Sequence, residues 1–235
     1  METSQSSVQP VPSPDVAKPK FYIGEVINSA WQKLIQNIWY FVGIAIVYTL
    51  INLSPEILSF LVEGLSDRVK VGGIYIGLVS VMLFVFFVLQ IITSLGIINI
   101  ALLSVDNKET RFSSLFNVMP VFLNYIAGSI LYVIIIWVGL ILFIIPGIIW
   151  QIKFGLFPYY ILEGAGPIEA LKKSGQVTYG SKWRIFALIL VLILINIVGA
   201  ILFFVGLVIT IPLSILTMAS VYRKLQPLAS NQIIS

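Results

Sequence analysis

The sequence predicts an all-α, polytopic integral membrane protein, a bundle of about six transmembrane helices. Of its 235 residues, 59% are hydrophobic and only 10% are charged, and the mean hydropathy is +1.03. Soluble domains carry about a quarter charged residues, so this composition argues against a soluble domain. Apolar runs of about 20 residues, enough to cross a hydrocarbon core of about 30 Å, recur along the chain. They are continuous rather than alternating, which favours helices over a β-barrel.

The first unit follows a polar tail. Residues 1–20 are rich in Ser, Pro and Gln, lack the apolar core of a cleavable signal, and are predicted to be disordered. Six apolar residues then recur at helical spacing: Ile23, Val26, Ile27, Ala30, Trp31 and Leu34. They predict an amphipathic interfacial helix, which we call an elbow, leading into a first span from Trp39 to Leu53. The segment from Ser54 forms either a capped helix of its own or a continuation kinked at Pro55.

Two further units are expected to repeat this plan. The second span covers about 74–103, a second elbow is predicted from Phe112 to Met119, and a third span covers 121–145. Pro146 and Gly147 are expected to turn the chain into a fourth span that closes near Glu163. A third elbow follows, and two spans fit between Arg184 and Tyr222. Their break lies either near 199–206 or at Pro212, and length favours the first.

An internal repeat supports three hairpin units. The stretches EVINSAWQKLIQNIW and EALKKSGQVTYGSKW align without a gap and share three identities: Glu25/Glu169, Gln32/Gln176 and Trp39/Trp183. Both are predicted elbows ending in a Trp that starts a span, which favours repetition; chance similarity between apolar sequences is the alternative. The transmembrane domain, residues 21–226, then comprises units of about 21–105, 108–163 and 164–226, followed by a short tail at 227–235.

The basic residues predict the orientation. With six spans, both termini and the connections at 106–120 and 163–183 share one side, which carries most of the Lys and Arg residues, whereas the other side carries Arg68 and Lys70. Basic residues near span ends stay in the cytoplasm, so we expect a bacterial inner-membrane protein with both termini cytoplasmic. The elbows then meet membrane lipids at the cytoplasmic surface, where they brace the hairpins or, alternatively, dock a protein partner.

Residues 145–184, IPGIIWQIKFGLFPYYILEGAGPIEALKKSGQVTYGSKWR, show a distinctive order of an IPG turn, a short span, an acidic residue, EALKKS, a glycine and a tryptophan. This order resembles bacterial six-span membrane families of uncharacterised function, including the membrane domain of some glycerophosphodiester phosphodiesterases. The closing TMASVYRKL is similar to the C-terminal end of that group. The resemblance covers roughly Trp31 to Leu225 and implies a six-helix membrane domain. The phosphodiesterase chemistry belongs to a separate soluble barrel that is not expected here, so no catalytic residue is implied.

The positions that match this pattern all have structural interpretations. They are Pro146, Gly147, Glu163, Glu169, Ser174, Gly180 and Trp183. Besides the turn at Pro146 and Gly147, Glu169 is expected to favour a helix N-terminus. Ser174 and Gly180 are expected to let helices approach closely, and Trp183 to anchor at the interface.

The composition also limits the chemistry. The sequence contains no Cys and no His, and it shows no phosphate-binding glycine loop and no metal-ligand spacing. We therefore expect no enzyme activity, no catalytic residue, no cofactor and no metal. The basic residues are scattered rather than arranged in a stripe, which argues against nucleic acid.

Few polar residues lie inside the predicted spans: Gln90, Thr93, Ser94, Asn99, Gln151, Lys153, Asn196, Thr210, Ser214 and Thr217. The hydroxyls of Thr210, Ser214 and Thr217 share one helical face, which suits either a small conduit or close packing, and packing is favoured. A lysine in a span is a functional candidate by default. Lys153 either snorkels toward the outer boundary at Pro146, the favoured interpretation, or contacts a substrate or lipid headgroup together with Gln151.

Two functions follow from these observations. The leading hypothesis is a non-enzymatic scaffold or accessory subunit at the cytoplasmic membrane, because three elbows accompany almost no polar lining. The alternative is a transporter or lipid-handling protein that contacts an anionic group through Lys153.

Overall fold

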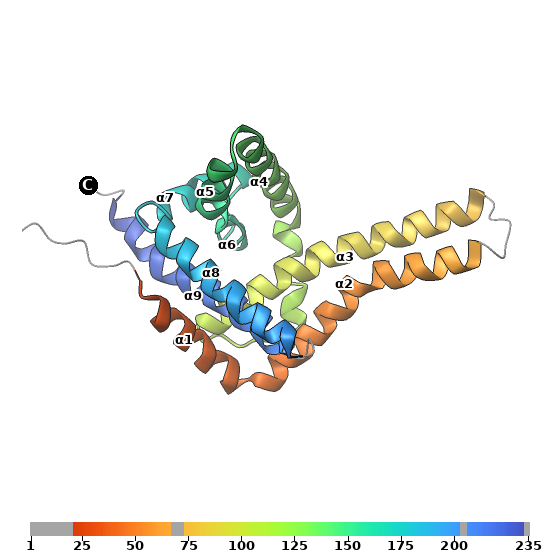
Figure 1. Ribbon diagram of the computed structural model, residues 1–235, viewed down its shortest axis with the longest axis horizontal. Coiled ribbons are helices and arrows are strands. Elements are labelled where there is room, and N and C mark those ends of the chain that lie inside the picture. Colours follow the sequence, from red (N-terminus) through yellow and green to blue (C-terminus); the bar gives the residue numbers. More distant parts are fainter. Residues whose placement is uncertain (1–20, 67–72, 203–205, 233–235) are drawn as a thin grey trace, which may run out of the picture.

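The computed structural model describes residues 21–66, 73–202 and 206–232, and these residues form helices joined by short connections (Figure 1). The elements are α1 (Ile23–Gln36), α2 (Ile38–Ser66), α3 (Gly73–Val105), the short 3₁₀ turns η1 (Phe112–Leu115) and η2 (Met119–Val121), α4 (Phe122–Leu142), α5 (Ile144–Phe154), α6 (Phe157–Leu162), α7 (Pro167–Val177), α8 (Lys182–Ile201) and α9 (Leu207–Gln232). The all-helical prediction is confirmed for this part of the chain. The predicted tail at 1–20 and the connection with Arg68 and Lys70 lie outside the described residues.

Four helical segments are long and apolar enough to cross a membrane. They are Gly77–Val105, Phe112–Leu142, Lys182–Ile201 and Leu207–Gln226. A fifth is reached when α1 and the start of α2, which meet at an angle of 93°, are taken together as one span. The count of four to five among the described residues agrees with a polytopic membrane protein and is lower than the six spans expected.

The helices α2 and α3 form a long hairpin that projects from the rest of the molecule (Figure 1). The helix α2 runs without interruption through Pro55 to Ser66, so the segment after Ser54 continues the first span and is not a separate helix. At 1.5 Å per residue, the 33 residues of α3 extend for about 50 Å, well beyond a hydrocarbon core of about 30 Å.

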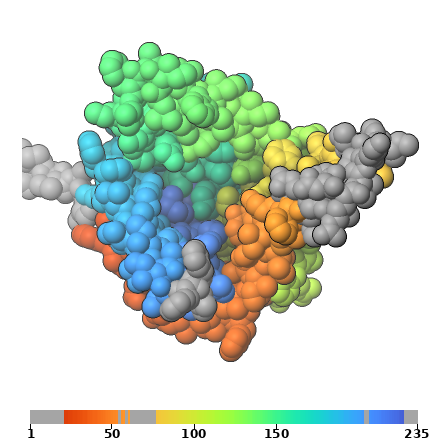
Figure 2. Space-filling view, turned by 45° about the vertical axis from the view of Figure 1, so that its right-hand side comes forward, coloured from red at the N-terminus to blue at the C-terminus, as the bar shows by residue number. Residues whose placement is uncertain are grey.

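The core is organised around α9, which packs against α1, α2, α3 and α8. In the space-filling view, only part of α9 is visible, between α8 in light blue and α2 in orange (Figure 2). The apolar face predicted for α1 contributes Val26, Ala30 and Leu34 to this core, where all three are buried. The face therefore packs against the chain itself, whereas Trp31 on the same helix stays partly exposed.

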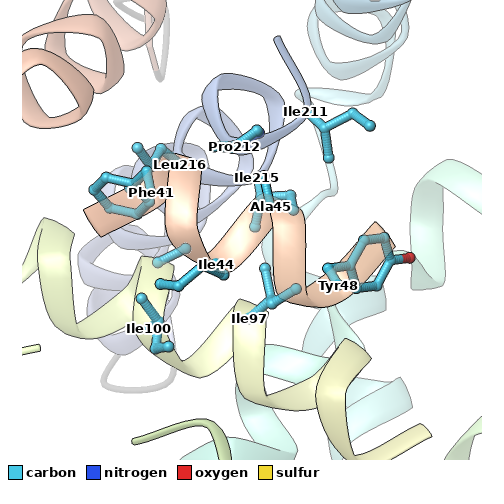
Figure 3. A pocket seen from close by; sticks show the side chains of 11 residues that line it. Phe41, Ile44, Ala45, Tyr48, Ile97, Ile100, Ile211, Pro212, Ile215 and Leu216 are labelled. Carbon is cyan, nitrogen blue, oxygen red and sulfur yellow. The ribbon is translucent and has the colours of Figure 1, made fainter. Parts of the chain in front are cut away.

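A small cavity of about 20 Å³ lies between α2, α3 and α9 (Figure 3). Its walls are apolar and include Ile44, Ile97 and Ile215. A space of this size holds at most one water molecule, and apolar walls keep such a space dry. It is a packing feature of the core and has no room for a ligand.

The second predicted elbow is wrong as an α-helix. Residues 112–121 form two 3₁₀ turns, with Leu115 and Val118 buried and Phe112 and Phe116 exposed. The Asn99 side chain of α3 donates a hydrogen bond of 3.0 Å to the Ser114 carbonyl. This contact occupies a carbonyl that a continuing α-helix would use four residues later, so the turn pattern replaces the helix.

The prediction that Pro146 and Gly147 turn the chain is also wrong. The reversal occurs at Phe143, which has an extended backbone, and α5 begins at Ile144, so Pro146 lies within its first turn. Gly147 instead lets α5 approach α4, because a methyl group added there would lie 2.7 Å from Leu140 Cγ. The α4–α5 hairpin is closed by this contact.

The predicted fourth span is not one helix. It is divided into α5, which ends at Phe154, and the short α6, whose first turn contains Pro158. Proline lacks the backbone N–H that a continuous helix requires, which favours a new helix start. In contrast, the favoured position of the last break is confirmed, since α8 ends at Ile201, α9 begins at Leu207, and Pro212 lies inside α9.

Candidate functional site

The break between α5 and α6 leaves backbone groups without helical partners, and α7 supplies them. The Ser174 hydroxyl donates to the Lys153 carbonyl at 3.0 Å and accepts from the Leu156 N–H at 3.1 Å. The Thr178 hydroxyl lies 3.1 Å from the same carbonyl and 2.9 Å from the Ser174 carbonyl of its own helix, so its single proton is shared between the two acceptors. Both hydroxyl residues are fully buried. Since unsatisfied backbone groups are costly away from water, these bonds hold α7 firmly against the break.

This docking brings three lysines together. Lys153 in the last turn of α5, Lys172 on α7 and Lys182 at the start of α8 line one cavity of about 600 Å³, which we call the lysine groove. Phe154, Gly175, Gln176 and Tyr179 complete its walls. Because the lysines come from three helices, the groove exists only when α7 is docked.

Glycine and aromatic residues position the lysine side chains. A methyl group added at Gly175 would lie 3.0 Å from Lys153 Cε, so this glycine leaves the space in which the Lys153 stem crosses α7. Lys153 Nζ lies 4.9 Å from the centre of the Phe154 ring, and Lys182 Nζ lies 5.9 Å from that of Tyr179. Cation–π contacts of this kind hold a charge without neutralising it.

Among the described residues, no carboxylate lines the lysine groove and none of its three lysines forms an ion pair. The neighbouring Lys173 is different, because it pairs with Glu169 at 2.7 Å on the exposed side of α7. The hydrogen bond from Lys173 lowers the pKa of Glu169 below its usual value. The three groove lysines thus remain uncompensated positive charges that face a common space, which favours an anion there.

An apolar groove of about 480 Å³ adjoins the lysine groove. It lies between α5 and α8, is lined by Ile145, Ile148, Ile149, Ile152, Trp183 and Phe186, and shares Lys182 with the lysine groove. One continuous surface therefore offers apolar side chains and then three cations. Trp183 is exposed in the first turn of α8, as expected for an interfacial anchor.

The expected snorkelling of Lys153 toward Pro146 is not what the structure shows. Lys153 lies at the opposite end of α5 from Pro146 and its side chain contacts α7. The reason is that the helix ends at Phe154, where a positive charge also suits the helix C-terminus. Gln151 is exposed and does not line the lysine groove, so the structure separates it from Lys153.

The other predicted positions have distinct roles. Ser174 closes the helix break and Glu169 lies in the first turn of α7, as expected for an acidic residue at a helix N-terminus. Gly180 does not mediate close helix packing. It takes a positive φ of 76° in the turn between α7 and α8, a conformation that glycine adopts without strain.

Glu163 belongs to a polar network that sequence analysis missed. Arg223 of α9 donates to Asp106 through two bonds of 2.7 and 2.6 Å and also pairs with Glu163. Glu163 accepts further bonds from the Tyr222 hydroxyl at 2.6 Å and from Gln226 at 2.8 Å. This network joins the ends of α3 and α6 to α9. The adjacent Tyr and Arg in TMASVYRKL were its only local signal.

The hydroxyl face on α9 supports packing over a conduit. Asn196 of α8 donates to the Ser214 hydroxyl at 2.8 Å, so the two helices are joined directly. Thr217 is buried and donates to the Leu213 carbonyl at 2.7 Å within α9. The Ser214 hydroxyl thus stabilises the α8–α9 contact, whereas Thr217 bonds within its own helix and the buried Thr210 hydroxyl has no hydrogen-bond partner among the described residues.

Replacing Ser174 with alanine is expected to lower the free energy of unfolding by about 1–3 kcal/mol, because it leaves the buried Leu156 N–H without a partner. Thermal unfolding in detergent measures this effect, with the remaining fraction of monodisperse protein as the readout. Ser113, whose side chain is exposed on η1, provides the matched control, and Ser113→Ala should change little. Equal effects of the two substitutions would contradict the role assigned to Ser174.

Neither a protein-family model, nor a curated protein, nor a solved structure matches this chain.

Proposed function

We propose that the chain is a multi-pass membrane protein that binds an anionic lipid, with the phosphate in the lysine groove and an acyl chain in the apolar groove. One observation carries this proposal: three lysines without ion pairs line a cavity that shares Lys182 with an apolar groove. A phospholipid has the same order of groups as this surface, because its negatively charged phosphate is followed by hydrocarbon chains. The function is therefore lipid handling by binding, without catalysis.

The energetics favour an anionic headgroup over a neutral one. Lysines near a membrane surface attract anionic lipid by about 1 kcal/mol each. The lysine ammonium is a compact charge that binds phosphate without requiring a fixed planar geometry. Three such groups also repel one another when the groove holds no anion, so binding relieves an unfavourable interaction.

The proposed placement agrees with the surroundings of the groove. The exposed Trp183 at the start of α8 suits the headgroup level, while Ile145 and Ile148 of α5 are exposed toward the apolar side. We propose that this level is the cytoplasmic boundary, with both termini in the cytoplasm. The finer architecture of six spans in three hairpins is also part of the proposal, with elbows at α1 and α7 only and with α5 and α6 together as a broken fourth span. It is supported by α1 and α7, each of which directly precedes a long apolar helix. Membership of the bacterial six-span families is proposed on the motif at 145–184.

The test is lipid retention by single and triple Lys→Met variants at positions 153, 172 and 182. Native mass spectrometry of protein in nanodiscs that contain phosphatidylglycerol should show retention weaker by about fivefold for each lysine and about 100-fold for the triple variant. Thermal stability without anionic lipid should not fall, because the three charges repel one another.

Lys173→Met is the matched control, since it removes the same charge from the next position of α7 but leaves the lysine groove intact. The proposal fails if phosphatidylglycerol retention is the same in the wild type and the triple variant. It also fails if Lys173→Met weakens retention as much as Lys153→Met does.

A scaffold or accessory-subunit role is the second candidate. It is supported by Tyr22, just before α1, and by Trp31 and Ile35 on α1, which remain exposed although Val26, Ala30 and Leu34 bury one face of that helix. The same mass spectra should then show a co-purified protein subunit that is lost after Trp31→Ser and Ile35→Ser. Spectra with lipid alone would argue against this role.

A further inference from the structure

A second cavity, of about 650 Å³, lies between α2, α3 and α4, away from the lysine groove. Six uncharged polar side chains line it: Tyr48, Asn52, Gln90, Ser94, Tyr125 and Ser129. We call it the neutral pocket. Only Gln90 and Ser94, both on α3, stood out in the sequence. The other four come in pairs from two other helices, Tyr48 and Asn52 from α2 and Tyr125 and Ser129 from α4.

The polar groups form a partly connected network. Gln90 donates to the Asn52 carboxamide oxygen at 2.6 Å, and the Asn52 N–H donates to the Tyr48 carbonyl at 2.8 Å. Tyr125 and Ser129 lie one turn apart on α4 and line the same cavity. The Gln90 oxygen and the Ser94 hydroxyl have no hydrogen-bond partner elsewhere in the described part of the chain. They are free to bond to a molecule in the cavity.

The depth of the neutral pocket limits what it holds. Gln90 lies near the middle of Gly77–Val105, one of the segments long enough to cross a membrane. Polar groups at this depth are expensive unless they are bonded, which favours an occupant with hydrogen-bonding atoms. Among the residues that the structure describes, no charged side chain lines the cavity, so a charged occupant would have no counter-ion there.

The rim of the neutral pocket shows how the occupant enters. Phe87, Val133 and Ile134 line the cavity and are themselves exposed on the apolar surface of α3 and α4. In a bilayer this surface faces lipid, so a hydrocarbon tail can extend outward between the helices while the head stays inside.

We infer that the neutral pocket binds a lipid with an uncharged, oxygen-bearing head, held by Asn52, Gln90 and Ser94. Diacylglycerol, with a hydroxyl and two ester carbonyls, and an isoprenoid quinone, with two ring carbonyls, share this chemistry. Both carry apolar tails that suit the open rim. This site is independent of the lysine groove and takes the opposite class of lipid.

The experiment uses the full chain in phosphatidylethanolamine nanodiscs that contain either diacylglycerol or an isoprenoid quinone, with native mass spectrometry to count retained lipid. The double variant Asn52→Leu, Gln90→Leu should retain about tenfold less neutral lipid, because it removes two hydrogen-bonding groups. Thr93→Val is the matched control, since Thr93 is buried on α3, bonds within its own helix and does not line the cavity. The arm in which retention depends on these residues identifies the lipid.

A second variant tests the inference even if the double variant fails to fold. Ser129→Phe keeps Asn52 and Gln90 but fills the cavity, and it should also abolish retention. Equal retention by wild type and Ser129→Phe overturns the inference, as does a wild type that retains neither diacylglycerol nor the quinone. The triple lysine variant should hold the neutral lipid normally, so failure at one site is distinguishable from failure at the other.

Discussion

Replacing Arg223 with methionine is expected to lower the free energy of unfolding by about 2–4 kcal/mol. The reason is that it removes the guanidinium that pairs with both Asp106 and Glu163, and leaves Asp106 only the longer contact of 3.8 Å with Lys108. The side chains of Asp106 and Glu163 are only 18% and 30% exposed, so water compensates them poorly. Tyr222, which stacks on Tyr159 at 4.8 Å and donates to Glu163, would lose a fixed partner as well. Thermal unfolding in detergent measures the change.

Arg111 offers the matched control. It also pairs with a carboxylate, Glu109, at 2.8 Å, but these side chains are 76% and 82% exposed. Exposed pairs contribute about 0–1 kcal/mol, so Arg111→Met should have little effect. Adding Asp106→Asn and Glu163→Gln to Arg223→Met should restore part of the stability. Similar losses for the two arginine variants would contradict the structural role of the network.

Replacing Gly96 with alanine is expected to destabilise the protein by about 1–3 kcal/mol, although alanine favours helices. A methyl group at Gly96 would lie 2.8 Å from the Leu115 Cα and 2.9 Å from its carbonyl carbon. Both atoms belong to the backbone of η1, which Asn99 also holds through the Ser114 carbonyl. The backbone cannot move aside as a flexible side chain does.

Gly77→Ala provides the comparison on the same helix. Nothing lies within 4 Å of the added methyl group there, so the substitution should stabilise α3 by up to about 1 kcal/mol. The two alanine substitutions are thus expected to move the unfolding temperature in opposite directions. A stabilising Gly96→Ala would show that η1 does not pack against α3 as described.

The parts of the fold that depend on local patterns were predictable. Continuous apolar runs marked α3, α8 and α9, and helical periodicity marked the face of α1 that carries Val26, Ala30 and Leu34. The broken span was not predicted, because its freed backbone groups are satisfied by Ser174 and Thr178, which follow about 20 residues later. Pro158 was a local signal that the apolar run concealed.

In the candidate sites, too, single residues could be predicted from local patterns, whereas their long-range contacts could not. Lys153 stood out because a charge interrupts an apolar run, but its association with Lys172 and Lys182 depends on the docking of α7. The network around Arg223 joins Asp106 and Glu163, which are far apart in the sequence. No local pattern identifies such pairs.

The hydroxyls that close the break at Lys153 and Leu156 have a consequence for how the protein is made. As the chain is synthesised, α5 and α6 emerge before α7, and until then the Lys153 carbonyl and the Leu156 N–H lack their partners. Unpaired backbone groups of this kind are costly. We therefore expect this part of the chain to reach its native structure only after the α7 hydroxyls have been synthesised, so that the second and third predicted units complete their folding together rather than one after the other.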